Sequence, residues 1–286
     1  MNIPRLNGVI KQFEQGKHAF VTFAPPDVGN TVAAATEPYD GMVFEMEHNP
    51  YDAKTLRDCL QYLLNRRQIV ESGSVAPAVT PLVRIPVNGG ERSQWIAKQA
   101  LDMGVYGIIW PHVSSVEEAY SAVAACRYAR PDGAPRFEPR GQRGDGPGTA
   151  ARYWGLTQQE YYDRADVWPI DPKGEILVGM MCEDVVGLKN LPKILKEVPG
   201  IGVVIIGEGD LSQNLGFPRQ YKHPTVAGAI GEIVSICKEH KVACGHPHVD
   251  SKNVQEVIDQ GFRWLMPRAE RSNAALALGR KIVSGA

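Results

Sequence analysis

The chain has 286 residues, 43% of them hydrophobic and 22% charged, so it is long and apolar enough to bury a large core. Its 31 basic and 32 acidic side chains leave a net charge of −1, which argues against a nucleic-acid or acidic-membrane partner that needs a strong positive field. No apolar run approaches the roughly 20 residues of a membrane span, and the five cysteines lack paired spacing, so we expect a cytoplasmic protein with reduced thiols.

Short apolar runs alternate with amphipathic segments along almost the whole chain. The runs are apolar at nearly every position, as in strands buried on both faces. They lie at 19–23, 41–45, 81–85, 106–110, 176–181, 202–206, 241–245 and 262–266. Helical patterns lie at 53–66, 92–103, 115–127, 187–197, 226–240, 252–260 and 270–283. Eight strands, each followed by a helix-sized segment, predict one (β/α)8 TIM barrel over residues 1–286, whereas an open doubly wound sheet is disfavoured because no GxGxxG turn is present.

Two segments interrupt this alternation. Residues 67–80 are expected to be a loop extension. Residues 129–175 are too rich in glycine, proline and charge to be regular throughout, and loops of this length inside a domain are usually functional or disordered. Because this second segment follows the fourth strand, we expect it at the carboxyl-end mouth of the barrel as an active-site loop.

Polar residues stand at the carboxyl end of most predicted strands, where a barrel would bring them to one mouth. Acidic and imidazole groups directly after buried strands are costly unless they are paired, hydrated or bound to metal, so their number suggests an active site. They are Glu45, Glu47, His48, Arg84, His112, Glu183, Glu208, Asp210, His246, His248, Arg268 and Glu270.

Glu183 and Asp210 are the candidate metal ligands. They follow neighbouring strands, and two carboxylates without nearby cysteine or histidine spacing suit a hard divalent cation such as Mg²⁺ or Mn²⁺. Either residue alone has an equally good explanation as a helix-capping acid. Taken together, the pair favours a metal site.

His48 is the candidate general base, because the ordinary pKa of histidine lies near working pH, and Glu45 or Glu47 could orient its ring. A purely structural histidine is the alternative. Arg84 at the end of a strand would be an expensive buried cation without an anion, so we expect it to face a carboxylate or an enolate oxygen. Its alternative is a structural ion pair inside the barrel.

The sequence resembles the HpcH/HpaI family of class II, metal-dependent pyruvate aldolases, in the HpcH/HpaI aldolase/citrate lyase superfamily. The resemblance runs from about residue 7 to about residue 283 and rests on ordered blocks. These are VFEMEHNPYD, PLVRIPVN, ALDMGVYGIIWPHVSSVEEA, PRGQRGDGPGTAARYWG, the glutamate of MMCED, and IIGEGDLSQNLGFP followed by KHPTV.

The resemblance implies a role for each matching residue. Glu183 and Asp210 would bind Mg²⁺, Mn²⁺ or Co²⁺, which would chelate pyruvate and stabilise its enolate as a Lewis acid. His48 would shuttle a proton to or from the aldol hydroxyl, and Arg84 would steady the enolate oxygen and the aldehyde carbonyl. Backbone amides at Gly209 and Asp210 would hold the substrate carboxylate. The family also implies a homo-oligomer, commonly a hexamer built as a trimer of dimers.

Several positions depart from the family pattern. Glu45-Met46-Glu47-His48 replaces Asp-x-Glu-His, and Glu208-Gly209 replaces Pro-Ala before the metal aspartate, which adds a possible charge beside the ion. Phe23 replaces a common tryptophan of the substrate pocket. His112, His246 and His248 replace apolar residues, and we expect them to line a more polar acceptor pocket unless they are buried and hydrogen-bonded.

The sequence therefore predicts a carbon–carbon lyase that cleaves a β-hydroxy-α-keto acid, with the hydroxyl β to the keto carbon, into pyruvate or a related α-keto acid and an aldehyde. A lyase acting on CoA thioesters or an oxaloacetate-type decarboxylase could use the same site. A catalytically drifted barrel that only binds keto acids is the non-enzyme alternative. Retention of His48, Arg84, Glu183 and Asp210 argues against it.

Overall fold

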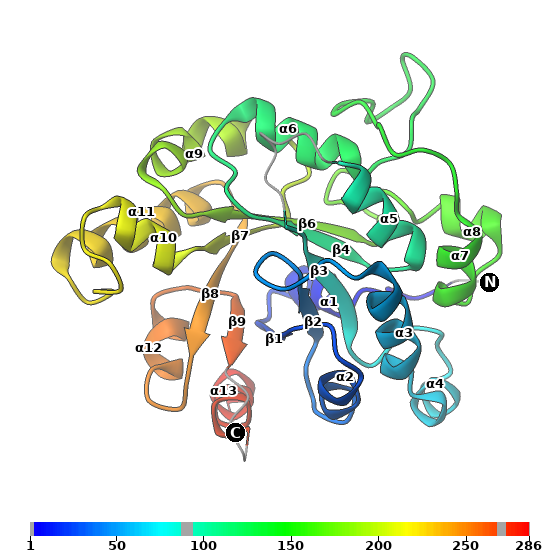
Figure 1. Cartoon of the computed structure of the whole chain (residues 1–286), viewed down its shortest axis with the longest axis horizontal. Coiled ribbons are helices and arrows are strands. Elements are labelled where there is room, and N and C mark those ends of the chain that lie inside the picture. Colours follow the sequence, from blue (N-terminus) through cyan, green and yellow to red (C-terminus); the bar gives the residue numbers. More distant parts are fainter. Residues whose placement is uncertain (1–2, 87–93, 268–272, 286) are drawn as a thin grey trace.

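The computed structural model describes residues 3–86, 94–267 and 273–285, and its strands form a closed parallel barrel (Figure 1). Neighbouring strands follow the order β4-β3-β2-β1-β9-β8-β7-β6, and pairing of β4 with β6 completes the ring. The ring strands are β1 (Ala19–Ala24), β2 (Gly41–Glu45), β3 (Thr80–Arg84), β4 (Gly107–Trp110), β6 (Ile176–Cys182), β7 (Val203–Ile206), β8 (Ala243–Val249) and β9 (Trp264–Pro267). The predicted (β/α)8 barrel is confirmed.

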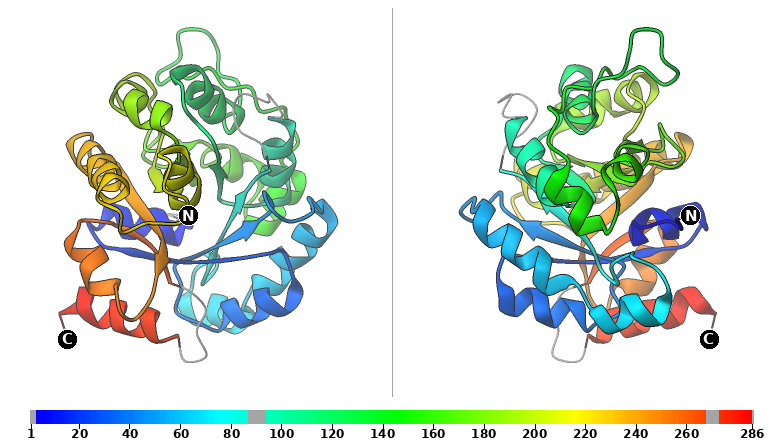
Figure 2. Two further views of the ribbon diagram at one scale, coloured as in Figure 1. Left: turned by 60° about the vertical axis from the view of Figure 1, so that its left-hand side comes forward. Right: turned by 90° about the vertical axis from the view of Figure 1, so that its right-hand side faces the viewer.

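Helices surround the ring, as two further views show (Figure 2). They are α1 (Gly8–Glu14), α2 (Val28–Ala35), α3 (Ala53–Leu63), α4 (Arg66–Ser72), α5 (Trp95–Met103), α6 (Val116–Ala125), α7 (Gly148–Trp154), α8 (Gln158–Tyr162), α9 (Val185–Glu197), α10 (Glu208–Asn214), α11 (Pro224–Glu239), α12 (Val254–Asp259) and α13 (Ala274–Ser284). Within the described ranges, no helix is long and apolar enough to cross a bilayer. The predicted segments 92–103 and 270–283 each begin outside the described residues.

The expectation of a loop over 67–80 is wrong in part, because α4 occupies its first residues. The side chain of Asn65 caps the start of this helix by accepting a hydrogen bond from the Gln68 N–H, and Gly73 ends it with a left-handed φ of 63°. Short helices of this kind span too few turns for their periodicity to be visible in the sequence. The remainder of the segment, from Ser74 to Val79, is irregular as expected.

The segment 129–175 does not lie at the carboxyl-end mouth, and this expectation is wrong. The ring of Trp154 in α7 stacks on Tyr106, just before β4 begins, and its Nε1–H donates to the Gly104 carbonyl at 2.8 Å. Arg164 likewise donates to the Ile3 carbonyl near the amino terminus. The reason is connectivity: α6 carries the chain from the mouth back to the amino ends of the strands before the segment begins.

Most of this segment is ordered around buried arginines. Arg127 is fully buried and binds Asp166 through Nε at 2.7 Å and through its second terminal nitrogen at 3.0 Å. It also donates to the carbonyls of Arg136 and Pro139, both at 2.7 Å. A two-residue strand, β5 (Val167–Trp168), then pairs with β6 outside the ring. The segment therefore lies on the amino-end side of the barrel.

Candidate active site

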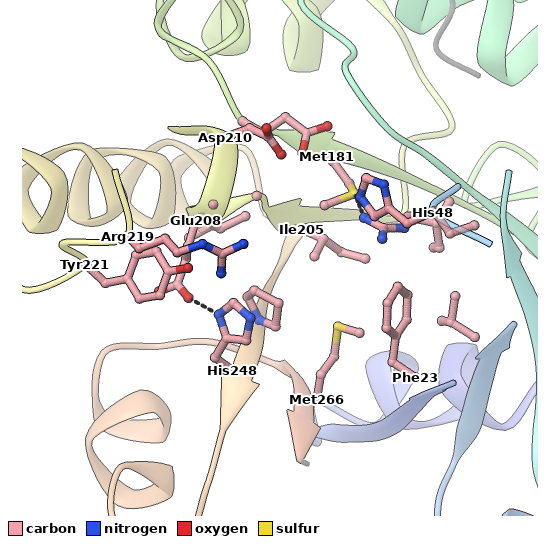
Figure 3. Close-up of a pocket in the computed structure, with 18 of the residues that line it drawn as sticks. Phe23, His48, Met181, Ile205, Glu208, Asp210, Arg219, Tyr221, His248 and Met266 are labelled. Carbon is pink, nitrogen blue, oxygen red and sulfur yellow. Dashed lines mark hydrogen bonds and ion pairs between the residues drawn. The ribbon is translucent and has the colours of Figure 1, made fainter. Parts of the chain in front are cut away.

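A cavity of about 400 Å³ lies at the carboxyl ends of the strands, where the sequence predicts an active site (Figure 3). Its wall includes all four residues expected to catalyse the reaction or to bind metal: His48, Arg84, Glu183 and Asp210. They come from the ends of β2, β3, β6 and β7, so closure of the barrel brings them together. Phe23 on β1 and Gly209 in α10, which were also predicted, line the same cavity.

Glu183, Asp210 and His112 form a compact group of metal-ligating side chains. One ligand atom from each lies within 4.8 Å of the other two. Glu183 is 3% exposed and receives a hydrogen bond at 2.5 Å from the backbone N–H of His112. Its carboxylate packs so closely over Gly207 that a side chain on Gly207 would overlap the atoms of Glu183. The position directly after β7 therefore needs glycine to leave room for this carboxylate.

The charges of this group fit a divalent cation. Burial raises the pKa of Glu183, and repulsion from Glu47 and Asp210 adds to the rise, while the His112 N–H and ring oppose it. A cation placed among these carboxylates would remove that repulsion. Carboxylate oxygens and an imidazole nitrogen are also ligand atoms that bind divalent metals. Glu183, Asp210 and His112 are thus the residues that could hold such an ion.

Arg84 lies between two carboxylates, and one of them, Glu47, also contacts His112 of the metal group. The Nε of Arg84 donates to Glu45 at 2.6 Å, a terminal nitrogen also pairs with Glu45, and the other terminal nitrogen lies 2.8 Å from Glu47. Its guanidinium also stands 4.8 Å from the centre of the Phe23 ring. The structural ion pair left open as an alternative is therefore present, and the same guanidinium lines the cavity.

His48 is the more exposed of the two predicted catalytic residues, with 68% of its side chain accessible. Its Nε2 lies 3.8 Å from Glu47, and Glu45 accepts hydrogen bonds from the backbone N–H groups of Glu47 and His48. Glu45 therefore holds the turn, and Glu47 lies beside the ring. Desolvation is the largest single influence on the pKa of Glu47, and it acts to raise that pKa. Contacts with His112, Arg84 and His48 together outweigh it, so the pKa of Glu47 is lowered.

Glu208 is turned away from the metal group, so the extra charge expected beside the ion is not there (Figure 3). Its carboxylate is 4% exposed and lies 2.5 Å from Nδ1 of His248 and 3.4 Å from Nε2 of His246. His248 lines the cavity, and the ring of Tyr221 stacks on it at 5.7 Å. One wall of the cavity is therefore polar.

Not every predicted substrate-binding residue borders the cavity. His246 is 8% exposed and lies behind the wall against Phe262, where burial lowers its pKa. His112 belongs to the metal group instead, and Glu47 lies beside it. Arg268 and Glu270 lie outside the described residues.

Sequence reasoning missed Arg219 and Tyr221, which line the cavity from the segment between α10 and α11. Arg219 has a left-handed φ of 57°, and its backbone N–H donates to the Ser212 hydroxyl at 2.9 Å. They follow a helix and not a strand, so no strand-end pattern marks them.

The comparisons with known proteins agree with this geometry. Residues 20–266 match the profile of HpcH/HpaI aldolase/citrate lyase. A hydroxypyruvate/pyruvate aldolase of Roseobacter denitrificans is 29% identical over 79% of this chain and 76% of its own length. A 2-keto-3-deoxy-L-rhamnonate aldolase of Salmonella paratyphi A is 31% identical over 87% and 82%. A crystal structure of an HpcH/HpaI family protein from Burkholderia cenocepacia superposes with a TM-score of 0.74, at 21% identity over 98% of both chains.

Proposed function

Because the chain belongs to the HpcH/HpaI aldolase/citrate lyase family, we propose that it is a class II, divalent-metal-dependent aldolase. It would reversibly cleave a β-hydroxy-α-keto acid to pyruvate and an aldehyde, the reaction type that the names of its relatives indicate. The observation that carries this proposal is the meeting of His48, Arg84, Glu183 and Asp210 around one cavity.

Glu183 and Asp210 would hold Mg²⁺, Mn²⁺ or Co²⁺, which supplies Lewis-acid polarisation of the keto group when bound. Backbone amides of Gly209 and Asp210, in the first turn of α10, would bind the substrate carboxylate. His48 would accept the proton of the β-hydroxyl group as the carbon–carbon bond breaks and the aldehyde leaves. The electron pair of that bond passes to the carbon next to the ketone, which then takes up a proton.

Arg84 would stabilise the negative charge that develops on substrate oxygens during this cleavage. Its guanidinium is held by Glu45 and Glu47, so its donors are fixed before the substrate arrives. Preorganised donors of this kind stabilise a transition state without reorganising during the reaction. Phe23 would pack against the guanidinium and close the apolar side of the pocket.

The aldehyde portion would lie against the polar wall, where His248 is held by Glu208. One ring nitrogen of His248 faces this carboxylate, which leaves the other for a hydroxyl or carbonyl group of the acceptor. His246 would contribute from behind the wall through its contact with Glu208. We propose an acceptor aldehyde that carries polar groups.

The two alternative readings receive less support. A cavity of about 400 Å³ suits a keto acid and a small aldehyde, and its described lining holds two arginines, one of them paired with Glu45 and Glu47. A nucleotide-bearing thioester would need a longer basic groove. A drifted barrel is disfavoured because all four functional residues line one cavity.

We also propose a homo-oligomer, a hexamer arranged as a trimer of dimers, in the cytoplasm. Exposed apolar side chains on outer helices support association: Val28 and Val32 on α2 and Leu278 on α13. Burial of such side chains between subunits is favourable because it removes apolar surface from water.

The test is pyruvate release from a panel of hydroxy-keto acids, measured with and without Mg²⁺, Mn²⁺ and Co²⁺. The aldehyde portions should differ in their number of hydroxyl groups, so that the same panel tests the polar wall. We expect metal-dependent pyruvate release, fastest with polar aldehyde portions. The proposal would be contradicted if no member of the panel released pyruvate.

A further inference from the structure

His112 occupies an unusual backbone conformation at the end of β4. Its φ is 51°, in the left-handed region that side-chain-bearing residues rarely adopt. Strained conformations of this kind persist where surrounding contacts hold them, and they concentrate at functional sites. Here the conformation has two consequences: the backbone N–H points at Glu183, and the ring lies beside the same carboxylate.

The two ring nitrogens of His112 face different carboxylates. Nδ1 lies 3.5 Å from Oε1 of Glu183, and Nε2 lies 3.4 Å from Oε1 of Glu47. A histidine that binds a metal through one nitrogen commonly donates the hydrogen of its other nitrogen to a carboxylate, which fixes the ring. Glu47 stands where that carboxylate is needed, and its side chain is only 8% exposed.

The spacing of the group also agrees with a shared ion. Ligand atoms of His112, Glu183 and Asp210 lie within 4.8 Å of one another. Ligand bonds of about 2.0–2.2 Å place two donors about 3.0 Å apart when they are adjacent and about 4.2 Å apart when they lie on opposite sides of an ion. The 3.5 Å between Nδ1 of His112 and Oε1 of Glu183 is close to the adjacent spacing, and the three groups would move closer together to share an ion.

We propose that Nδ1 of His112 is a third protein ligand of the ion held by Glu183 and Asp210, and that Glu47 positions the ring by accepting its Nε2–H. This inference rests on the proposed function, because it concerns the same ion. The chemical consequence is metal choice. An imidazole nitrogen suits the later transition metals, whereas Mg²⁺ prefers oxygen ligands, so the site would favour Co²⁺ over Mg²⁺.

The first test measures a metal–nitrogen bond in the unaltered protein. Mn²⁺ is loaded into the purified full-length chain, and pulsed electron paramagnetic resonance records coupling to ¹⁴N. We expect the coupling of one directly bound nitrogen. Bound Mn²⁺ without such a coupling would overturn this inference, while a protein that binds no divalent ion at all would overturn the proposed function as well.

The second test compares affinities for Co²⁺ and Mg²⁺ by competition with a chromophoric chelator. We use His112→Asn, because asparagine tolerates a left-handed φ better than most residues. The expected loss is about 10–100-fold for Co²⁺, the range known for disturbed ligand shells, with a loss of less than about 3-fold for Mg²⁺. His248→Asn removes an imidazole from the same cavity and should change neither affinity.

Glu47 is a positioning residue in this scheme, and its variants separate positioning from charge. Glu47→Gln keeps an oxygen that can accept the Nε2–H, whereas Glu47→Ala removes it. We expect Glu47→Ala to lower the Co²⁺-to-Mg²⁺ affinity ratio by about 10-fold and Glu47→Gln to restore most of it. Equal losses for both metals in His112→Asn and in Glu47→Ala would overturn the proposal, because they would indicate general damage to the site.

Discussion

Glu183 packs directly over Gly207, the residue between the end of β7 and the start of α10. A methyl group on Gly207 would overlap both Cβ and the carboxylate of Glu183. The chain thus places its two candidate acidic ligands by different means: Asp210 by its position in the first turn of α10, and Glu183 by a space that only glycine leaves. This relationship gives a test of the metal site that alters neither acidic ligand.

Gly207→Ala should displace the carboxylate of Glu183 and weaken metal binding by about 10–100-fold, as disturbed ligand shells do. Titration with Mn²⁺ measures the effect. Gly209→Ala, two residues away, is the matched control for metal affinity, because a methyl group there meets nothing within 4 Å. If both variants bound Mn²⁺ as the unaltered protein does, Glu183 would not be a ligand.

His48→Ala should lower kcat for aldol cleavage by about 10²–10⁴-fold, the usual contribution of general acid–base catalysis. Metal affinity should change little, because His48 is not in the group formed by His112, Glu183 and Asp210. Steady-state kinetics and Mn²⁺ titration on the same preparation separate the two effects. Equal losses in both would make His48 a ligand or a structural residue.

Arg84→Lys should lower kcat by about 10²-fold or more, similar to removal of a preorganised oxyanion donor. Lysine keeps the positive charge but cannot contact Glu45 and Glu47 and still offer a donor to substrate. The measurement is kcat at saturating keto acid and metal. Near-normal turnover in this variant would show that charge alone is needed.

Arg127→Leu should lower the free energy of unfolding by about 3–5 kcal/mol, because it leaves Asp166 as a buried charge without its principal partner. Urea denaturation measures this change. Arg136→Ala is the control: that side chain is 46% exposed in its ion pair with Asp171, so a loss below about 1 kcal/mol is expected. Similar stability of the two variants would contradict the structural role of the buried arginine.

The fold was predictable because each barrel strand is apolar on both faces, which gives the runs from 19–23 to 262–266 a clear signal. The position of 129–175 was not, since strand order alone does not say on which face a segment lies. The face is decided by α6, which returns the chain to the amino ends of the strands before the segment begins. Several helices of seven or eight residues, such as α4 and α10, were missed because they span only about two turns.

Site prediction succeeded where barrel geometry decides the outcome and failed where a local turn does. Convergence of Arg84, Glu183 and Asp210 follows from parallel strands that end at one mouth. The direction of Glu208 toward His248 and the left-handed turn of His112 depend on single backbone angles and neighbouring side chains. No residue pattern reports these, so the extra charge beside the ion was wrongly expected and the contacts of His112 were not foreseen.

The central claim is that Glu183 and Asp210 hold a divalent ion needed for carbon–carbon cleavage. The most direct measurement is pyruvate release from the best substrate of the panel after treatment with EDTA, and again after metal is restored. We predict that EDTA abolishes release, that Mn²⁺ or Co²⁺ restores it, and that neither restores it in Glu183→Gln or Asp210→Asn. Undiminished release in EDTA, or in both variants, would contradict the claim.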